Sequence, residues 1–100
     1  MNHLLRQAQQ MQQKMGALQK ELETREIDVS SGGGAVKIKI NGKQEIISLS
    51  ISQECLSTND KELIEETLLT AINQAVKESQ TMVSSAMSKV TGGLNIPGLT

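Results

Sequence analysis

The pattern with the most evident chemical potential is a run of three glycines, Gly32 to Gly34, at the start of "GGGAVKIKINGK". A phosphate-binding loop needs such glycines where a helix begins, so that main-chain N–H groups and the helix dipole face the anion. The residues that follow instead alternate between apolar and cationic, and the Gly-Lys-Ser/Thr ending of such a loop is missing. We therefore interpret the glycines as a turn that leads into a half-buried strand.

The other reactive side chains are poorly placed for catalysis. His3 is the sole histidine and lies beside the chain end, where a general base would be weakly held. Cys55 is the sole cysteine and has no evident histidine partner, which favours a structural thiol. Glu65 and Glu66 are adjacent on a predicted helix and point in different directions, so they do not form an acid–base pair. We expect no enzyme, no cofactor, no metal and no small-molecule substrate.

The composition narrows the class of protein further. A chain of 100 residues makes one small domain, which gains much buried surface from dimerisation. It has no Phe, Trp or Tyr, so bases cannot stack on aromatic side chains as in many single-strand and RNA-binding modules. One cysteine suits a reducing cytoplasm, and no apolar run reaches the length of a membrane span. The net charge is -1, yet residues 1–50 hold seven Lys/Arg and five Asp/Glu, against three and six in residues 51–100.

Residues 2–24 have the spacing of an amphipathic helix with a coiled-coil seam. Six apolar residues follow alternating steps of four and three, namely Leu4, Ala8, Met11, Met15, Leu18 and Leu22. The outer face carries six glutamines among its cationic residues. This pattern predicts a helix that packs along one side and presents polar amides and cations along the other.

Three strands are predicted next, around Ile27 and Val29, over residues 35–41 and over residues 44–52. Asn41-Gly42 is a strong signal for a two-residue type I′ turn with positive φ at both positions. Such a turn pairs Val36 with Ile47 and Ile40 with Lys43. The apolar face then holds Val36, Ile38, Ile40, Ile47, Leu49 and Ile51. The polar face holds Lys37, Lys39, Gln44, Ser48 and Ser50, and we expect helix to cover only the apolar side.

The last block predicts a long helix. After a loop around residues 54–58, Asn59 and Glu62 have the spacing of a capping box. An apolar stripe then runs as far as Val90, and a helix of roughly 30 residues spans about 45 Å, twice the length of a seven-residue strand. We expect it to overhang the sheet as an arm, covered by the Leu4–Met11 end of the first helix. Residues 1–91 are predicted to form one domain, and residues 92–100 a flexible tail with Gly and Pro.

Five stretches spread over the chain carry a resemblance: "QAQQMQQKM", "GGGAVKIKINGK", "EIISLSIS", "DKELIEETLLTAINQAV" and "GGLNIPGL". Together they resemble the YbaB/EbfC family of bacterial nucleoid-associated proteins over essentially the whole length. The resemblance implies an α+β protomer, built as a helix, a three-stranded antiparallel sheet and a long helix. It also implies a tight homodimer with protruding helical arms, located in the cytoplasm at the nucleoid, that binds double-stranded DNA with little sequence preference. In "SISQECL" the chain departs from the family, whose third strand usually ends in an Asp-Pro-like turn.

The residues that could contact DNA are those that neutralise or hydrogen-bond phosphates. Arg6, Gln13 and Lys20 recur every seven residues on one outer line of the first helix, each about 10.5 Å from the next. Gln10 and Lys14 flank that line. The polar sheet face offers Lys37 and Lys39, and the long helix offers Lys77 and Lys89.

An alternative function comes from a different class. Two helices that flank a hairpin and protrude as arms also suit a small chaperone or adaptor that clasps other proteins. Four methionines, Met11, Met15, Met82 and Met87, could line such a clasp if they were exposed on the inner side of the arms. Burial of these methionines in the helix seam is the simpler expectation, and their exposure would favour the chaperone or adaptor.

Overall fold

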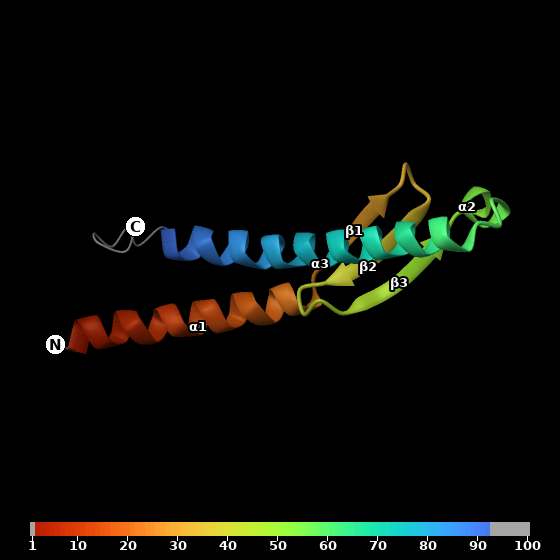
Figure 1. The fold of residues 1–100 in the computed structure, drawn as a ribbon. Coiled ribbons are helices and arrows are strands. Elements are labelled where there is room, and N and C mark those ends of the chain that lie inside the picture. The colour runs from red at the N-terminus through yellow and green to blue at the C-terminus, as the bar shows by residue number, and fades with distance from the viewer. Residues whose placement is uncertain (1, 93–100) are drawn as a thin grey trace.

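The elements of the computed structural model, which describes residues 2–92, follow the order helix, three strands and long helix. Their bounds are α1 (Asn2–Thr24), β1 (Glu26–Ser31), β2 (Val36–Asn41), β3 (Ile46–Ile51), α2 (Gln53–Ser57) and α3 (Lys61–Gly92). The molecule is 68 Å in its longest dimension. The beginning of α1 and the end of α3 lie at one end of it, and α2 lies at the other (Figure 1). The predicted α+β protomer is confirmed.

The core lies between α3 and the first two strands of the sheet. The strands are antiparallel in the order β1-β2-β3. Buried β-branched residues from β1 and β2 pack against two alanines of α3, whose small side chains let the helix lie close to the sheet. This set consists of Val29, Val36, Ile38, Ile40, Ala71 and Ala75. The prediction that helix covers the apolar side of the sheet therefore holds for β1 and β2.

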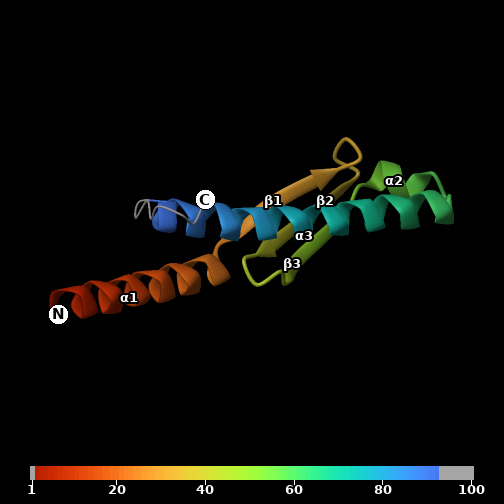
Figure 2. The same ribbon diagram turned by 60° about the vertical axis from the view of Figure 1, so that its left-hand side comes forward.

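The long helix overhangs the sheet as predicted. α3 has 32 residues whereas each strand has six, so about half of the helix extends beyond the strands. α1 runs beside this overhang, but the two helices diverge toward their free ends in both views (Figures 1 and 2). Leu22 is 1% exposed whereas Leu4 is 72% exposed. The predicted cover by the Leu4–Met11 end is thus wrong within one chain, because only the Leu22 end of the seam meets α3 closely.

The turn between β2 and β3 differs from the predicted one. Gln44 has a positive φ of 62°, whereas Asn41 and Gly42 do not have a positive φ. The Gln44 amide donates to the Asn41 carbonyl at 3.1 Å, and the Asn41 amide donates to the Glu45 carbonyl at 3.1 Å. This is the longer hairpin loop in which a turn is followed by a residue in the left-handed region. Gln44 therefore lies in the loop and not on the polar face of a strand.

The changed turn shifts the register of β3. Val36 pairs with Ile51 and Ile38 with Leu49, and an irregularity follows between Lys39 and Ile40. The predicted pairs of Val36 with Ile47 and of Ile40 with Lys43 are wrong. Because the shift at Val36 is four residues, an even number, Leu49 and Ile51 still share a face with the apolar residues of β2.

Two smaller predictions at the helix ends also need correction. Asp60, and not Asn59, caps α3: its side chain accepts from the Leu63 amide at 3.2 Å, while Asn59 has a φ of 53°. The predicted loop around residues 54–58 contains the short helix α2, whose first turn is capped by the Ser52 hydroxyl. α3 ends at Gly92. Residues 93–100 of the predicted tail lie outside the described residues.

Candidate nucleic-acid interface

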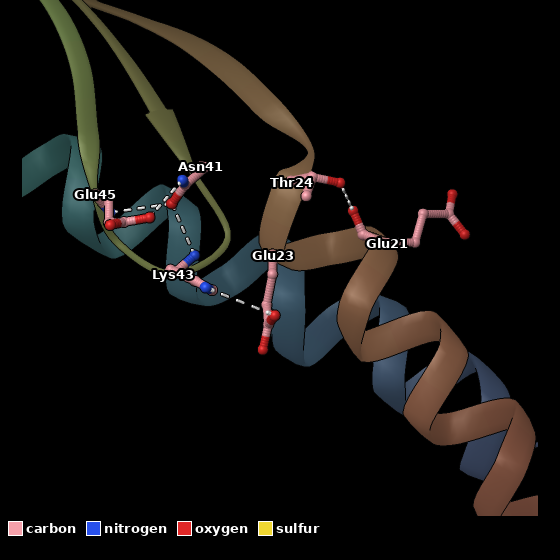
Figure 3. Close-up of polar contacts among 6 residues, drawn as sticks. All are labelled: Glu21, Glu23, Thr24, Asn41, Lys43 and Glu45. Carbon is pink, nitrogen blue, oxygen red and sulfur yellow. Dashed lines mark hydrogen bonds and ion pairs between the residues drawn. The ribbon is translucent and has the colours of Figure 1, made fainter.

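The β2–β3 turn contacts the C-terminal end of α1 (Figure 3). The Asn41 side chain accepts from the amides of Lys43 and Glu45, at 2.9 and 3.1 Å, and donates to the Glu45 carboxylate at 3.0 Å. This network shapes the turn that faces the end of α1. There the Lys43 ammonium lies 3.9 Å from the Glu23 carboxylate, and Gly42 lies directly against the Leu22 carbonyl. Glycine is required at position 42 because a Cβ atom would overlap that carbonyl.

The same turn also holds α3. Ser79 is 0% exposed, and its hydroxyl donates to the Asn41 main-chain carbonyl at 2.6 Å. Asn41 is itself buried, at 7% exposure. Both long helices are thus anchored on one turn of the sheet. Beyond this anchor, the helices extend away from the strands as an arm, which we define as residues 3–20 of α1 and 80–90 of α3.

The arm is cationic and carries no acidic residue. Its charged residues are Arg6, Lys14, Lys20 and Lys89. The five predicted DNA-binding residues of α1 are all exposed, namely Arg6, Gln10, Gln13, Lys14 and Lys20. By helical periodicity, the line through Arg6, Gln13 and Lys20 lies on the side of α1 opposite Leu22, the residue that α1 buries. The structure therefore brings these residues together on one solvent-facing surface.

The cations of α1 differ from most others in their pairing. Ion pairs hold Arg25 to Glu21 at 2.8 Å, Lys43 to Glu23 at 3.9 Å and Lys61 to Glu65 at 3.7 Å. Within residues 2–92, no carboxylate lies within 4.0 Å of the cationic groups of Arg6, Lys14 or Lys20. An unpaired exposed cation can bind a phosphate without first losing a partner. The cations of α1 are therefore stronger candidates for anion binding than the ion-paired cations elsewhere in the chain.

The other predicted pair, Lys37 and Lys39, lies apart from the arm on the open face of the sheet. Lys39 is 4.0 Å from the Glu26 carboxylate and is paired in register with Asp28. The same face is lined by serines of β1 and β3. Two lysines thus share this face with two carboxylates, which leaves it near neutral.

Groups that could support other chemistry are dispersed. No three His, Cys, Asp or Glu side chains within residues 2–92 gather as a metal ion would require. The His3 ring lies 3.4 Å from the Gln7 amide, its neighbour one turn away, and Cys55 is a buried free thiol in α2. The four arm methionines, Met11, Met15, Met82 and Met87, are half-buried rather than exposed. No helix of the described residues is both long and apolar enough to pass through a lipid bilayer.

For two residues, the role in positioning the arm was not predicted from the sequence. Asn41 was expected in the turn because of the Asn-Gly pair, but its tie to Ser79 joins residues 38 positions apart. Ser79 lies in the apolar stripe of α3, and nothing in the neighbouring sequence indicates a structural role for a serine there. Only the approach of α3 to the turn gives this hydroxyl a partner.

Comparison with known proteins gives a consistent result. Residues 1–94 match the model of the YbaB/EbfC DNA-binding family. A nucleoid-associated protein of Alkaliphilus metalliredigens is 43% identical over 99% of this chain and 87% of its own length. One of Desulforamulus reducens is 48% identical over 99% and 94%. A solved structure of an uncharacterised protein from Helicobacter pylori is similar in fold, with a TM-score of 0.66, 23% identity and coverage of 94% and 95%.

Proposed function

The chain belongs to the YbaB/EbfC DNA-binding family, and we propose that it acts at the nucleoid as a homodimer that binds double-stranded DNA through phosphate contacts, with little sequence preference. The observation that carries this proposal is the acid-free arm, on which Arg6, Lys14 and Lys20 are exposed and have no ion-pair partner among residues 2–92. Such a surface attracts any duplex through its phosphates. It offers no aromatic side chain for stacking on bases.

The glutamines of α1 complement its cations. Gln10 and Gln13 lie exposed between Arg6 and Lys20. Their amides can donate to phosphate oxygens without adding charge, which fixes the position of a duplex more than it raises affinity. Lys37 and Lys39 take a smaller part in this proposal, because Glu26 and Asp28 offset their charge on the same face.

The homodimer is proposed from β3, the edge strand that α3 leaves largely uncovered. α3 packs on β1 and β2, whereas apolar residues of β3 stay open: Ile46 is 41% exposed, Ile47 49% and Leu49 42%. Three large exposed apolar side chains within residues 46–49 of an edge strand are a liability for a protein in water. A second copy supplies an identical apolar strip, and a two-fold axis places the two strips against each other. We therefore assign β3 to the dimer interface, which also doubles the number of cationic arms available to one duplex.

A gel-shift titration with unrelated duplexes, with sedimentation of the same sample, tests this proposal. We expect a dimer at about 10 µM and similar micromolar affinity for every duplex at physiological salt. If two chains neutralise about four to six phosphates, a log–log plot of affinity against salt has a slope of about -4 to -5. Absence of salt-sensitive binding at about 50 mM salt would overturn the DNA-binding proposal and favour the protein-clasping alternative.

A further inference from the structure

The end of the molecule opposite the arm, where α2 and the start of α3 lie (Figure 1), carries the reverse charge. We call residues 53–70, which comprise α2, the loop after it and the first ten residues of α3, the acidic pole. It contains five acidic residues, Glu54, Asp60, Glu62, Glu65 and Glu66. Its one cation, Lys61, lies 3.7 Å from the Glu65 carboxylate. The net charge of -1 for the whole chain therefore conceals a separation of charge along a 68 Å molecule.

Exposed leucines accompany these carboxylates. Leu56 is 48% exposed, Leu63 45% and Leu69 61%. Leu63 and Leu69 line an open groove between α3 and the glycine turn of the β1–β2 hairpin, with Glu66 beside them. A groove that combines leucines with a carboxylate fits a segment that is both apolar and cationic.

The tip of the arm has that chemistry. Leu4 is 72% exposed and Leu5 61% exposed, and Arg6 follows them directly. No acidic residue lies within residues 3–20 to weaken the attraction. We propose that the acidic pole of one molecule binds the α1 tip of a second copy, head to tail. This contact goes beyond the proposed function, because it joins different surfaces of two molecules and is distinct from the two-fold β3 interface.

The physical character of this contact makes it dependent on salt. The charges on both surfaces are exposed, so the attraction between them is screened within about 10 Å at 0.1 M salt. Duplex DNA carries a denser negative charge than the pole and would compete for the same arm. Head-to-tail contact would therefore form in the DNA-free protein and be released when the arm engages a duplex.

Sedimentation velocity of the full-length protein at about 10 µM tests the proposal, in about 25 mM and about 300 mM salt. We expect species larger than the dimer at low salt and their loss at high salt. The variant Glu62→Gln/Glu65→Gln/Glu66→Gln should lose the larger species at low salt. Glu78→Gln, which removes an exposed charge of α3 outside the pole, should retain them. The mass at high salt reports the β3 dimer separately, so failure of the dimer and failure of the head-to-tail contact are distinguishable.

A charge exchange gives a sharper test. Arg6→Glu/Lys14→Glu/Lys20→Glu reverses the net charge of the arm, and Glu62→Lys/Glu65→Lys/Glu66→Lys reverses that of the pole. Each variant alone should sediment without larger species, whereas an equimolar mixture should regain them, because the reversed arm meets the reversed pole. The proposal is overturned if the parent forms no larger species at low salt or if the mixture stays dispersed. It is also overturned if a duplex of about 20 base pairs, at a concentration at which gel shifts show that the parent is bound, leaves the parent's larger species intact at low salt.

Discussion

Ser79 and Asn41 join the long helix to the hairpin turn: the buried Ser79 hydroxyl donates to the Asn41 main-chain carbonyl at 2.6 Å. Ser79→Ala removes this donor and should lower the free energy of unfolding by about 1–2 kcal/mol. Urea denaturation at fixed protein concentration measures the loss. Ser84→Ala, at an exposed position of the same helix, is the control and should change stability by less than about 0.5 kcal/mol. Equal effects of the two variants would show that the buried hydrogen bond has no special role.

Gly42 determines how closely α1 approaches the turn. A Cβ atom at this position would overlap the Leu22 carbonyl, so Gly42→Ala should displace α1 from the hairpin and destabilise the fold by about 1–3 kcal/mol. Gly16→Ala is the matched control, because no atom lies within 4 Å of a Cβ there and alanine favours a helix. We expect it to raise stability by about 0.5–1 kcal/mol in the same denaturation experiment. A neutral Gly42→Ala would contradict the close approach.

The effect of a substitution at Gly33 should depend on the backbone preference of the new residue and not on the space around its side chain. Its φ is 67°, and nothing lies within 4 Å of a Cβ added there. Gly33→Val should destabilise the fold by about 1–2 kcal/mol, since a β-branched residue resists this conformation. Gly33→Asn should cost less, because asparagine visits the left-handed region more readily. Thermal unfolding of both variants tests the order, and a folded Gly33→Val that had lost nucleotide binding would restore the phosphate-loop interpretation.

The dimer interface proposed on β3 predicts a sharp difference between two exposed leucines. Leu49→Lys places a charge on the apolar strip and should convert the dimer to monomers at about 10 µM. Leu69→Lys places the same charge on the acidic pole and should leave the dimer intact. Sedimentation equilibrium at about 300 mM salt suppresses the head-to-tail contact and measures the dimer alone. A dimeric Leu49→Lys would move the interface away from β3.

The DNA contact is tested by neutralising the three cations of α1 together. Arg6→Gln/Lys14→Gln/Lys20→Gln should weaken binding to all duplexes alike and flatten the salt slope toward zero, because fewer counterions are released. Gel shifts at several salt concentrations measure both quantities. The matched control, Lys37→Gln/Lys39→Gln, should weaken binding much less, since carboxylates already offset the charge of that face. If the control lost more affinity than the triple variant, the DNA contact would lie on the sheet.

The local sequence determined the elements of this fold, because hydrophobic periodicity and turn residues act over short distances. The seam of α1, the alternation around Ile38 and the long stripe of α3 each give their element without help from the rest of the chain. The same locality explains the errors at Asn59 and at the Asn41-Gly42 turn. Each of these motifs permits several geometries, and packing selects one: at the turn, Gly42 must clear the Leu22 carbonyl and Asn41 must meet Ser79.

Only the tertiary structure decided which surfaces are available for binding. The sequence placed Arg6, Lys14 and Lys20 on one face of α1, but their lack of partners depends on where every carboxylate lies in space. Likewise, the apolar pattern of β3 indicated burial, and its exposure follows from the path of α3 across β1 and β2. The distribution of charge is the clearest example of this difference between sequence and tertiary structure. Composition records a total of -1, whereas the separation of a cationic arm from an acidic pole requires that the start of α1 and the end of α3 lie at the same end of the molecule.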